Sequence, residues 1–319
     1  MAPAARVETT VELTDFLGRP AVRWSVGAST FEAVPGAGAR LVRWDWQRSG
    51  AARQPLIFWP PESPPADFAF TRGGNPILFP FCARTFVGGT IHLWRDPAGV
   101  VRPMPLHGIA RQAEFRVIEL TDDGFTSQLV ADAAAREAYP FEYRFEVRYV
   151  FHATGFRVEL SLANLGATPI PWSAGHHFYV VVPWRAGLTR ADYSVSIPTT
   201  QSWRQDGAGL LDPVATTGRV ALTSETLNAT MHGALAADEM EVRERASGVR
   251  VRIAMPGAIR DFPDAVFTTW TQGDAAPYYC FEPWMGPANA PSLGRGVHFV
   301  PPGGRQVFPV EVLFEVSAN

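Results

Sequence analysis

The stretch FEYRFEVRYVF, residues 141–151, carries the clearest structural signal in the chain. Aromatic and aliphatic side chains alternate with charged ones from Phe141 to Phe151. A period of two residues puts the apolar side chains on one face of a β-strand and the charges on the other. The alternating signs of the charges also suit cross-strand pairing on a solvated face. We therefore predict a strand with one buried face.

A second alternating run follows this strand after a turn at His152–Gly155. Phe156, Val158 and Leu160 point one way, and the residues between them point the other, which predicts an antiparallel hairpin. Weaker strand patterns, turn signals at 123–124, 247–248 and 303–304, and a short helical pattern at 131–138 complete the interpretation. The weaker strand patterns cover 22–34, 41–46, 115–120, 240–245, 249–255, 265–270 and 307–316.

The composition agrees with a fold built from many short strands. The chain has 319 residues, with 28 glycines and 28 prolines that suit tight turns. It contains no long segment of helical period, no linker and no internal repeat. We predict an all-β fold, a large antiparallel β-sandwich, with residues 1–319 in a single domain.

Charge and residue usage exclude several classes of function. A formal net charge of −3 argues against a nucleic-acid partner. All 28 basic residues are arginines, which excludes Schiff-base aldolases, pyridoxal-phosphate enzymes and P-loop proteins because each needs a lysine amine. The chain has no secretory leader pattern and no apolar run near the ~20 residues of a membrane span, so we expect a cytoplasmic protein without a membrane partner.

Metal and nucleotide cofactors are not expected. Cys82 and Cys280 are too few for a zinc site built on thiolates, and no GxGxxG or P-loop motif is present. His176 and His177 are adjacent, so on a strand they point to opposite faces and only one can line a given cavity. We expect neither a metal nor a cofactor, and a general acid suits one of these histidines better.

Polar groups in four apolar or turn-rich segments are the candidates for chemistry. Arg84 ends the run NPILFPFCAR, and His107 lies in HGIAR beside a glycine that permits unusual backbone geometry. Glu282 lies among aromatic residues in YYCFEPW, where a carboxylate is costly unless it is paired or functional. The alternatives are a solvent-facing arginine, a surface histidine and a structural salt bridge.

Tryptophans beside these segments suit a carbohydrate. Flat aromatic faces pack on the apolar C–H faces of sugar rings, and Trp284 follows Glu282 by two residues. Trp172, Trp184 and Trp270 also lie beside these segments and suit a carbohydrate in the same way. The alternative is that they are core residues, as most tryptophans are.

Together, and in this order, the four segments resemble the aldose 1-epimerase (galactose mutarotase-like) family. The resemblance rests on NPILFPFCAR at 75–84, HGIAR at 107–111, GHHFYV at 175–180 and FEPWMGPANA at 281–290. It implies a β-supersandwich and interconversion of the α and β anomers of a free sugar. The combination is much more specific than any one of these short motifs.

The resemblance also implies roles for individual residues. His177 looks like the general acid and Glu282 like the general base. His176 is expected to support His177 and to lie among the substrate contacts. Arg84 and His107 look like contacts to sugar hydroxyls, and His107 is also a candidate for polarising the ring oxygen.

Two departures from the family's pattern bear on the choice of sugar. An aspartate that binds sugar hydroxyls in many members is missing from the nearest counterpart here, NATMHG at 228–233, where Asn228 or His232 is the expected substitute. Val180 also replaces a common aromatic residue.

The expected reaction needs only a base and an acid. The base removes the proton of the anomeric hydroxyl while the acid protonates the ring oxygen, and a carboxylate and an imidazole can exchange these roles. A hexose 6-phosphate is an alternative substrate, because Arg72, Arg84 and Arg111 lie near the proposed site. A sugar-binding protein without activity is the alternative from another class. A glycosidase ranks last because it usually needs two carboxylates.

Overall fold

The computed structural model describes residues 8–47, 52–216 and 218–316. Nearly all of its regular structure is antiparallel β-sheet, which confirms the predicted fold class. Three short α-helices are present in these ranges, α1 (Ala133–Ala138), α2 (Ala258–Asp261) and α3 (Ala290–Leu293), together with the 3-10 helices η1 (Pro65–Asp67), η2 (Ala110–Gln112) and η3 (Arg190–Asp192). None of the helices described is long and apolar enough to cross a bilayer.

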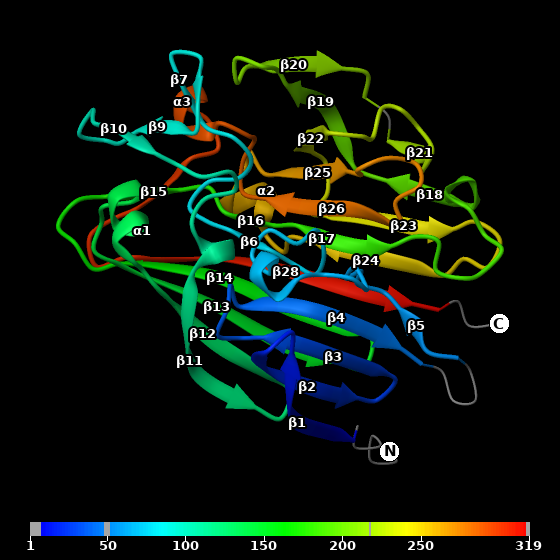
Figure 1. Ribbon diagram of the computed structural model, residues 1–319. Helices are drawn as coiled ribbons and strands as arrows, with labels where there is room; N and C mark the ends of the chain where they lie inside the picture. The colour runs from blue at the N-terminus through cyan, green and yellow to red at the C-terminus, as the bar shows by residue number, and fades with distance from the viewer. Residues whose placement is uncertain (1–7, 48–51, 217, 317–319) are drawn as a thin grey trace, which may run out of the picture.

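Three large sheets make up the molecule (Figure 1). The five-stranded sheet runs in chain order through β1 (Thr9–Phe16), β2 (Arg19–Val26), β3 (Ser29–Val34), β4 (Arg40–Trp46) and β5 (Gln54–Pro55). The nine-stranded sheet has the order β11 (Glu114–Thr121), β12 (Gly124–Val130), β13 (Tyr143–His152), β14 (Gly155–Asn164), β28 (Arg305–Glu315), β24 (Arg250–Ala254), β23 (Glu239–Glu244), β18 (Tyr193–Ser196) and β21 (Arg219–Ala221).

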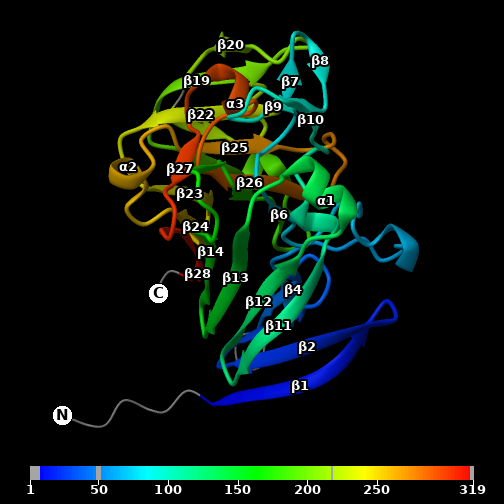
Figure 2. The same cartoon turned by 90° about the vertical axis from the view of Figure 1, so that its left-hand side faces the viewer.

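The eight-stranded sheet lies at the opposite end from β1 and β2 in both views (Figures 1 and 2). Its order is β20 (Leu211–Val214), β19 (Thr199–Gln205), β22 (Thr230–Leu235), β25 (Val266–Trp270), β26 (Tyr278–Trp284), β16 (Gly175–His176) and β6 (Ile77–Leu78), and β17 (Phe178–Val181) also pairs with β26. Three strand pairs lie outside these sheets: β7 (Phe86–Val87) with β8 (Thr90–Ile91), β9 (Leu93–Arg95) with β10 (Val101–Pro103), and β15 (Ile170–Trp172) with β27 (His298–Val300).

The predicted hairpin is β13 and β14, and its register follows the sequence pattern. Val147 pairs with Leu160 and Phe151 with Phe156, and the alternate apolar side chains of both strands are buried. On the opposite face Arg148 lies across from Glu159, with a nitrogen–oxygen distance of 3.8 Å. The prediction of one buried face and one face of paired charges is confirmed.

The expected strand at 22–34 is wrong in one respect. It is two strands, β2 and β3, joined by a turn at Gly27–Ala28. Gly27 adopts φ +56°, a left-handed conformation that glycine allows without strain and that ends the first strand. The other six weaker patterns correspond to β4, β11, β23, β24, β25 and β28, with ends that shift by a residue or two.

The core lies against the apolar face of the nine-stranded sheet. Phe151 of β13 stacks on Phe31 of β3 with ring centroids 4.4 Å apart, so this face covers the five-stranded sheet. Phe156 of β14 contacts Phe178 of β17 at 5.8 Å, so the same face also covers the eight-stranded sheet. The back of the eight-stranded sheet is thereby fixed against the core, and its other face is left to form a site.

Candidate active site

The register of the eight-stranded sheet brings His177 and Glu282 together. β16 and β17 both pair with β26, with Gly175 opposite Trp284 and Phe178 opposite Phe281. These two pairings belong to one continuous antiparallel register, in which His177 falls directly across from Glu282. Residues opposite each other in an antiparallel pair carry their side chains on the same face, a few ångströms apart. Two residues far apart along the chain thus become neighbours.

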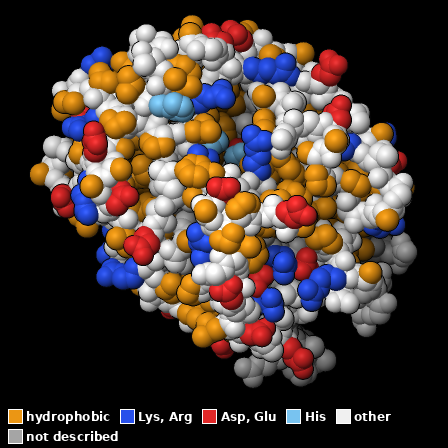
Figure 3. Space-filling model, in the orientation of Figure 1, with side chains coloured by type: hydrophobic (Ala, Val, Ile, Leu, Met, Phe, Trp, Pro, Cys, Tyr) orange, Lys and Arg blue, Asp and Glu red, His pale blue; other side chains and the backbone are white. Residues whose placement is uncertain are grey.

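The same row continues across the sheet and forms the floor of a cavity. Glu282 pairs with Thr268 of β25, and Thr268 pairs with Met231 of β22. His177, Glu282, Thr268 and Met231 all line a cavity of about 480 Å³. The walls include the loop residues 69–72, 83–84 and 106–107, together with Arg111 and with Gln205 at the end of β19. Figure 3 shows a hollow on this face with histidine side chains inside it and basic side chains on its rim.

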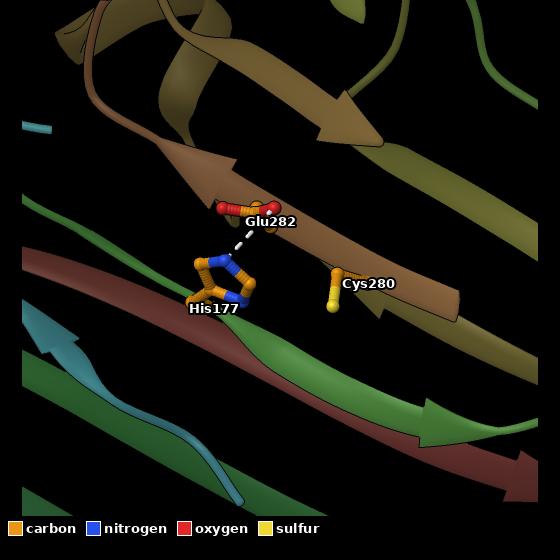
Figure 4. A group of neighbouring side chains, drawn as sticks. All are labelled: His177, Cys280 and Glu282. Carbon is orange, nitrogen blue, oxygen red and sulfur yellow. Dashed lines mark ion pairs between the residues drawn. The ribbon is translucent and has the colours of Figure 1, made fainter. Parts of the chain in front are cut away.

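His177 and Glu282 form a close, buried pair on the cavity floor. His177 Nε2 lies 3.3 Å from Glu282 Oε1, and the side chains are 9% and 2% exposed (Figure 4). His177 Nδ1 and Glu282 Oε2 have no hydrogen-bond partner among the described residues. Burial raises the pKa of Glu282 well above its usual value and lowers the pKa of His177 well below its own. These directions favour a protonated carboxyl beside a neutral imidazole.

Cys280 adds a thiol to this pair (Figure 4). It precedes Glu282 by two residues on β26, so both side chains lie on the same face. Donor atoms of His177, Cys280 and Glu282 lie within 4.8 Å of one another, and such a set of donors could hold a zinc-like cation. However, burial raises the pKa of the Cys280 thiol well above its usual value, which keeps the thiol protonated. The absence of a metal site stays a prediction.

His107 is fixed in one tautomer at the cavity wall. Its Nδ1 accepts a hydrogen bond from the Ala83 backbone N–H at 3.1 Å, which leaves the ring proton on Nε2. Burial and the cations of Arg111 and Arg84 lower the pKa of His107 to about 3. The imidazole is therefore neutral and offers an N–H donor. Its ring centroid lies 5.4 Å from that of His177.

Three arginines line the cavity without an acidic partner. Arg72, Arg84 and Arg111 make no ion pair with the described residues. Arg72 lies over the ring of Trp270, and Arg111 lies over the ring of Phe70. The Nε of Arg111 is buried and has no hydrogen-bond partner in the described part of the chain. The cavity therefore combines one carboxyl group, which burial keeps protonated, with three cations.

The structure corrects the expected sugar contact from His176. This side chain points to the opposite face from His177, where it is fully buried and stacks on Phe178 with centroids 5.3 Å apart. Successive side chains on a strand point in opposite directions, so His176 cannot share the cavity with its neighbour. Its expected support of His177 is indirect. Asn75 lies 3.1 Å from His176 Nδ1, and its Oδ1 accepts the backbone N–H of His177.

The structure also corrects the expectation that Asn228 or His232 takes the place of the sugar-binding aspartate. Asn228 is exposed outside the cavity lining, and its Oδ1 accepts a hydrogen bond from the Thr271 backbone N–H. His232 is buried on the far side of β22, where it contacts Ser202 and Thr269. Alternation along β22 gives the cavity to Met231 instead.

Trp284 lines the cavity, and its contact with a sugar stays a prediction. Its indole N–H is already used, because Nε1 donates to the His176 carbonyl oxygen at 3.2 Å. Trp284 therefore offers the cavity mainly the apolar surface of its ring.

Several site residues were missed by the sequence reasoning. Tyr179 lines the cavity and stacks on His177 with centroids 4.6 Å apart. Its position two residues after His177 was the available signal, since it predicts the same face. Asn75 is fully buried and holds both histidines of the GHH segment. A polar residue before proline at the start of an apolar run was its signal.

The chain is similar to known proteins over most of its length. The family model described as aldose 1-epimerase matches residues 23–254, which include His177 and end before Glu282. A search of curated proteins found no match.

Solved structures share the fold. A galactose mutarotase-like protein from Clostridium acetobutylicum is 18% identical with a TM-score of 0.80, over 97% of this chain and 99% of that one. The Slr1438 protein from Synechocystis sp. PCC 6803 is 22% identical with a TM-score of 0.74, over 98% and 97%. A galactose mutarotase related enzyme from Lactobacillus acidophilus is 18% identical with a TM-score of 0.73, over 92% and 96%.

The family match covers well over half of the sequence, and the shared fold agrees with it. The chain belongs to the aldose 1-epimerase family.

Proposed function

We propose that this protein is an aldose 1-epimerase that interconverts the α and β anomers of a hexose. One observation carries the proposal: His177 and Glu282 are cross-strand neighbours on the floor of a cavity, 3.3 Å apart. An imidazole and a carboxyl group at one place supply the acid and the base that ring opening needs. The reaction requires no hydride, phosphoryl or electron transfer, so these two groups suffice for the chemistry.

The pair shares one transferable proton. Glu282 as a carboxylic acid with a neutral His177 holds as many protons as a carboxylate with an imidazolium. Moving the proton from Glu282 to His177 across their short contact prepares a base and an acid. Hydroxyl groups of a bound sugar stabilise the two charges that result, because they replace part of the solvation lost on burial.

The mechanism then uses the two groups in turn. Glu282 takes the proton of the anomeric hydroxyl while the imidazolium of His177 gives its proton to the ring oxygen, and the C1–O5 bond opens. Rotation about C1–C2 exposes the other face of the aldehyde, and closure returns both protons. General acid–base assistance typically contributes ~10²–10⁴-fold. His107 supplies a neutral N–H donor for a sugar oxygen, with its tautomer set by Ala83.

Exchange of freshly dissolved sugars tests the proposal. We expect the protein to accelerate the interconversion of α-D-glucose or α-D-galactose, followed by NMR exchange or polarimetry. Glu282→Gln and His177→Ala should each nearly abolish this acceleration, because each removes one end of the proton path. Asn228→Ala should retain it, because Asn228 lies outside the cavity. Circular dichroism checks that every variant is folded.

Other outcomes of this experiment would select other functions. Full activity in Glu282→Gln or His177→Ala would remove the assignment of the pair. Saturable sugar binding without faster exchange would identify a sugar-binding protein without activity.

A phosphorylated hexose is a second candidate substrate. The supporting observation is that Arg72, Arg84 and Arg111 line one cavity without an acidic partner among the described residues. Guanidinium groups bind phosphate through paired, charge-assisted hydrogen bonds. The same exchange assay with D-glucose 6-phosphate and D-glucose decides between the two substrates. A higher kcat/KM for the phosphate ester would favour the phosphorylated sugar, and equal values would exclude a phosphate preference.

A further inference from the structure

Arg40, the first residue of β4, is a fully buried cation that has no carboxylate partner among the described residues. Its guanidinium instead donates to backbone carbonyls of one segment. The distances are 2.6 Å to the Phe68 oxygen, 2.5 Å to the Thr71 oxygen and 2.6 Å to the Gly73 oxygen. Trp59 and Phe68 cover it, with ring centroids 4.9 and 5.5 Å from its central carbon.

Such a group is costly to bury. Taking a charge out of water is unfavourable unless hydrogen bonds replace its solvation. Burial lowers the pKa of Arg40 only to about 9, so the side chain is still charged at neutral pH. Arginine presents five donors in a planar fork, and the carbonyls of Phe68, Thr71 and Gly73 use that fork. A lysine ammonium has three donors on one nitrogen, whereas here two separate guanidinium nitrogens bind the carbonyls, one that of Phe68 and the other those of Thr71 and Gly73.

The segment that Arg40 holds is one wall of the cavity. Residues 69–72 all line it, and Phe70 is 62% exposed at its edge. The two aromatic–cation contacts of the wall, Phe70 with Arg111 and Arg72 with Trp270, connect this segment to the rest of the cavity. Within the segment, the backbone N–H groups of Phe70 and Thr71 both donate to the Asp67 oxygen, each at 2.8 Å.

The segment is also pressed closely against β4. Gly74 adopts φ +68°, and a Cβ at this position would lie 2.4 Å from the Leu41 carbonyl oxygen. The next residue, Asn75, donates its backbone N–H to that same oxygen at 2.8 Å and holds the backbone N–H of His177 through its side chain. Gly74, which packs the segment against β4, and Asn75, which binds the backbone of His177, are therefore adjacent in the chain.

We propose that Arg40 is a positioning residue for sugar binding: it holds the carbonyls of residues 68–73 and so fixes the wall formed by residues 69–72. The proposal rests on the proposed function for its kinetic readout. Arg40 itself touches no substrate, because it lies beneath this wall and outside the cavity lining. The wall contains neither His177 nor Glu282, so we expect it to contribute to binding in the ground state and the transition state alike.

The test compares Arg40→Lys with a matched control. Arg190 is a second buried arginine that donates to carbonyls, those of Ala276 and Tyr278, in a segment that does not line the cavity. Arg40→Lys should raise KM about tenfold or more with kcat within about threefold, since uniform binding is lost. Arg190→Lys should leave both constants unchanged. A fall in kcat without a rise in KM, or the same rise in KM in both variants, would overturn the proposal.

Hydrogen–deuterium exchange keeps the proposal testable apart from activity. In Arg40→Lys, peptides covering 67–74 should exchange faster than in the wild type, and peptides covering 271–278 should not. In the wild-type protein, D-galactose or D-glucose 6-phosphate should slow exchange in 67–74. This second measurement needs no variant, so it holds even where Arg40→Lys does not fold.

The two proposals fail in different ways. A wild-type protein that accelerates no sugar's exchange, while a sugar still protects 67–74, overturns the proposed function and leaves the role of Arg40. A wild-type protein that is active, while neither sugar protects 67–74, overturns the role of Arg40 alone.

Discussion

At the scale of single residues, burial determines the protonation of the proposed acid and base. Glu282 and His177 each lie where water cannot solvate a charge, and the pKa of each moves toward its neutral form. The two shifts have one cause and opposite directions. A pair in which both members are neutral and only one proton is mobile can work in either direction of an isomerisation.

The pH dependence of exchange follows from these directions. Burial lowers the pKa of His177 well below the usual 6.5. The pair therefore takes up an additional proton only at a pH below 6.5. Above the usual pKa of glutamate, Glu282 retains the shared proton, because burial raises its pKa. We expect the acid limb of kcat/KM to lie below pH 6.5 and any basic limb to lie well above the usual pKa of glutamate. The measurement is kcat/KM against pH, with spontaneous exchange subtracted at each point.

An acid limb above pH 6.5 would contradict this prediction, since it would mean that the working imidazole is more basic than a free one. Asn228→Ala serves as the control, because it changes no group that lines the cavity and should reproduce the wild-type profile.

At the scale of elements, Gly108 brings the His107 turn against the strand segment at Phe79. Gly108 has φ +78°, and a Cβ there would lie 2.0 Å from the Phe79 carbonyl oxygen. Phe79 and Gly108 also form a parallel β-bridge, and the next backbone N–H, that of Ile109, donates to the same oxygen at 2.6 Å. This close approach leaves no room for a side chain, and it sets where His107 stands.

Gly108→Ala should therefore lower both stability and activity. We expect a loss of about 1–3 kcal/mol in the free energy of unfolding, because the backbone must move to admit the methyl group. The shift of His107 should also lower kcat/KM. The matched control is Gly207→Ala, at an exposed glycine with no atom within 4 Å of the added Cβ. Its change should stay within about 0.5 kcal/mol. Denaturant titration of the two variants checks the difference, and equal stabilities would refute it.

How much the sequence revealed depended on the type of element. The hairpin of β13 and β14 was predictable because one of its faces is buried and the other is charged. The polarity of each residue therefore indicates the face on which its side chain lies. The turn at Gly27–Ala28 interrupts an apolar alternation without a strong turn dipeptide, so 22–34 looked like one strand. Short strands such as β6 and β16 have two residues each, too few for a period to be visible.

The residues of the candidate site also differ in how far the sequence alone can predict them. His177 and Glu282 carried a chemical signal, and the structure brings them together. The resemblance to the family groups His176 and Asn228 with them, but alternation along the strand turns His176 to the other face, and Asn228 lies in an exposed turn outside the cavity lining. Arg40 and Asn75 act through backbone groups of other segments, and such contacts depend on tertiary packing that no local pattern encodes.

At the scale of the whole molecule, the main apolar cluster runs from Val22 to Phe314 and draws on all three large sheets. This continuity supports the single domain predicted for 1–319, which stays a prediction. Burial in this molecule also extends to histidines. The pKa is lowered to about 3 for His107 and His176 and to about 4 for His232, with burial the main cause in each.

These histidines make stability depend on pH. Below pH 6.5 the unfolded chain binds protons that the folded protein refuses, so the free energy of unfolding falls as the pH falls. Each such histidine contributes up to about 1.4 kcal/mol per pH unit. Glu282 acts in the opposite sense, because its raised pKa adds stability as the pH falls toward 4.5. Since the histidines outnumber it, we expect lower stability at pH 5 than at pH 7 in denaturant titrations.

His176→Gln should flatten this dependence by the share of one histidine. His152→Gln, at an exposed position, should leave it as in the wild type. A protein equally stable at pH 5 and pH 7 would show that the histidines are not buried as described.

The pairing of β16 and β17 with β26 also means that the proposed activity can return during refolding only after these strands reach their native register. Were these strands to dock one residue out of step, every side chain on one of them would turn to the other side, and a well-packed sheet would present the wrong histidine. Under the proposed function, a compact intermediate in which these strands are not yet paired in the native register has no activity on sugars. Recovery of turnover after dilution from denaturant should therefore lag behind the return of β-sheet circular dichroism, and the lag measures how long the chain takes to find its alignment.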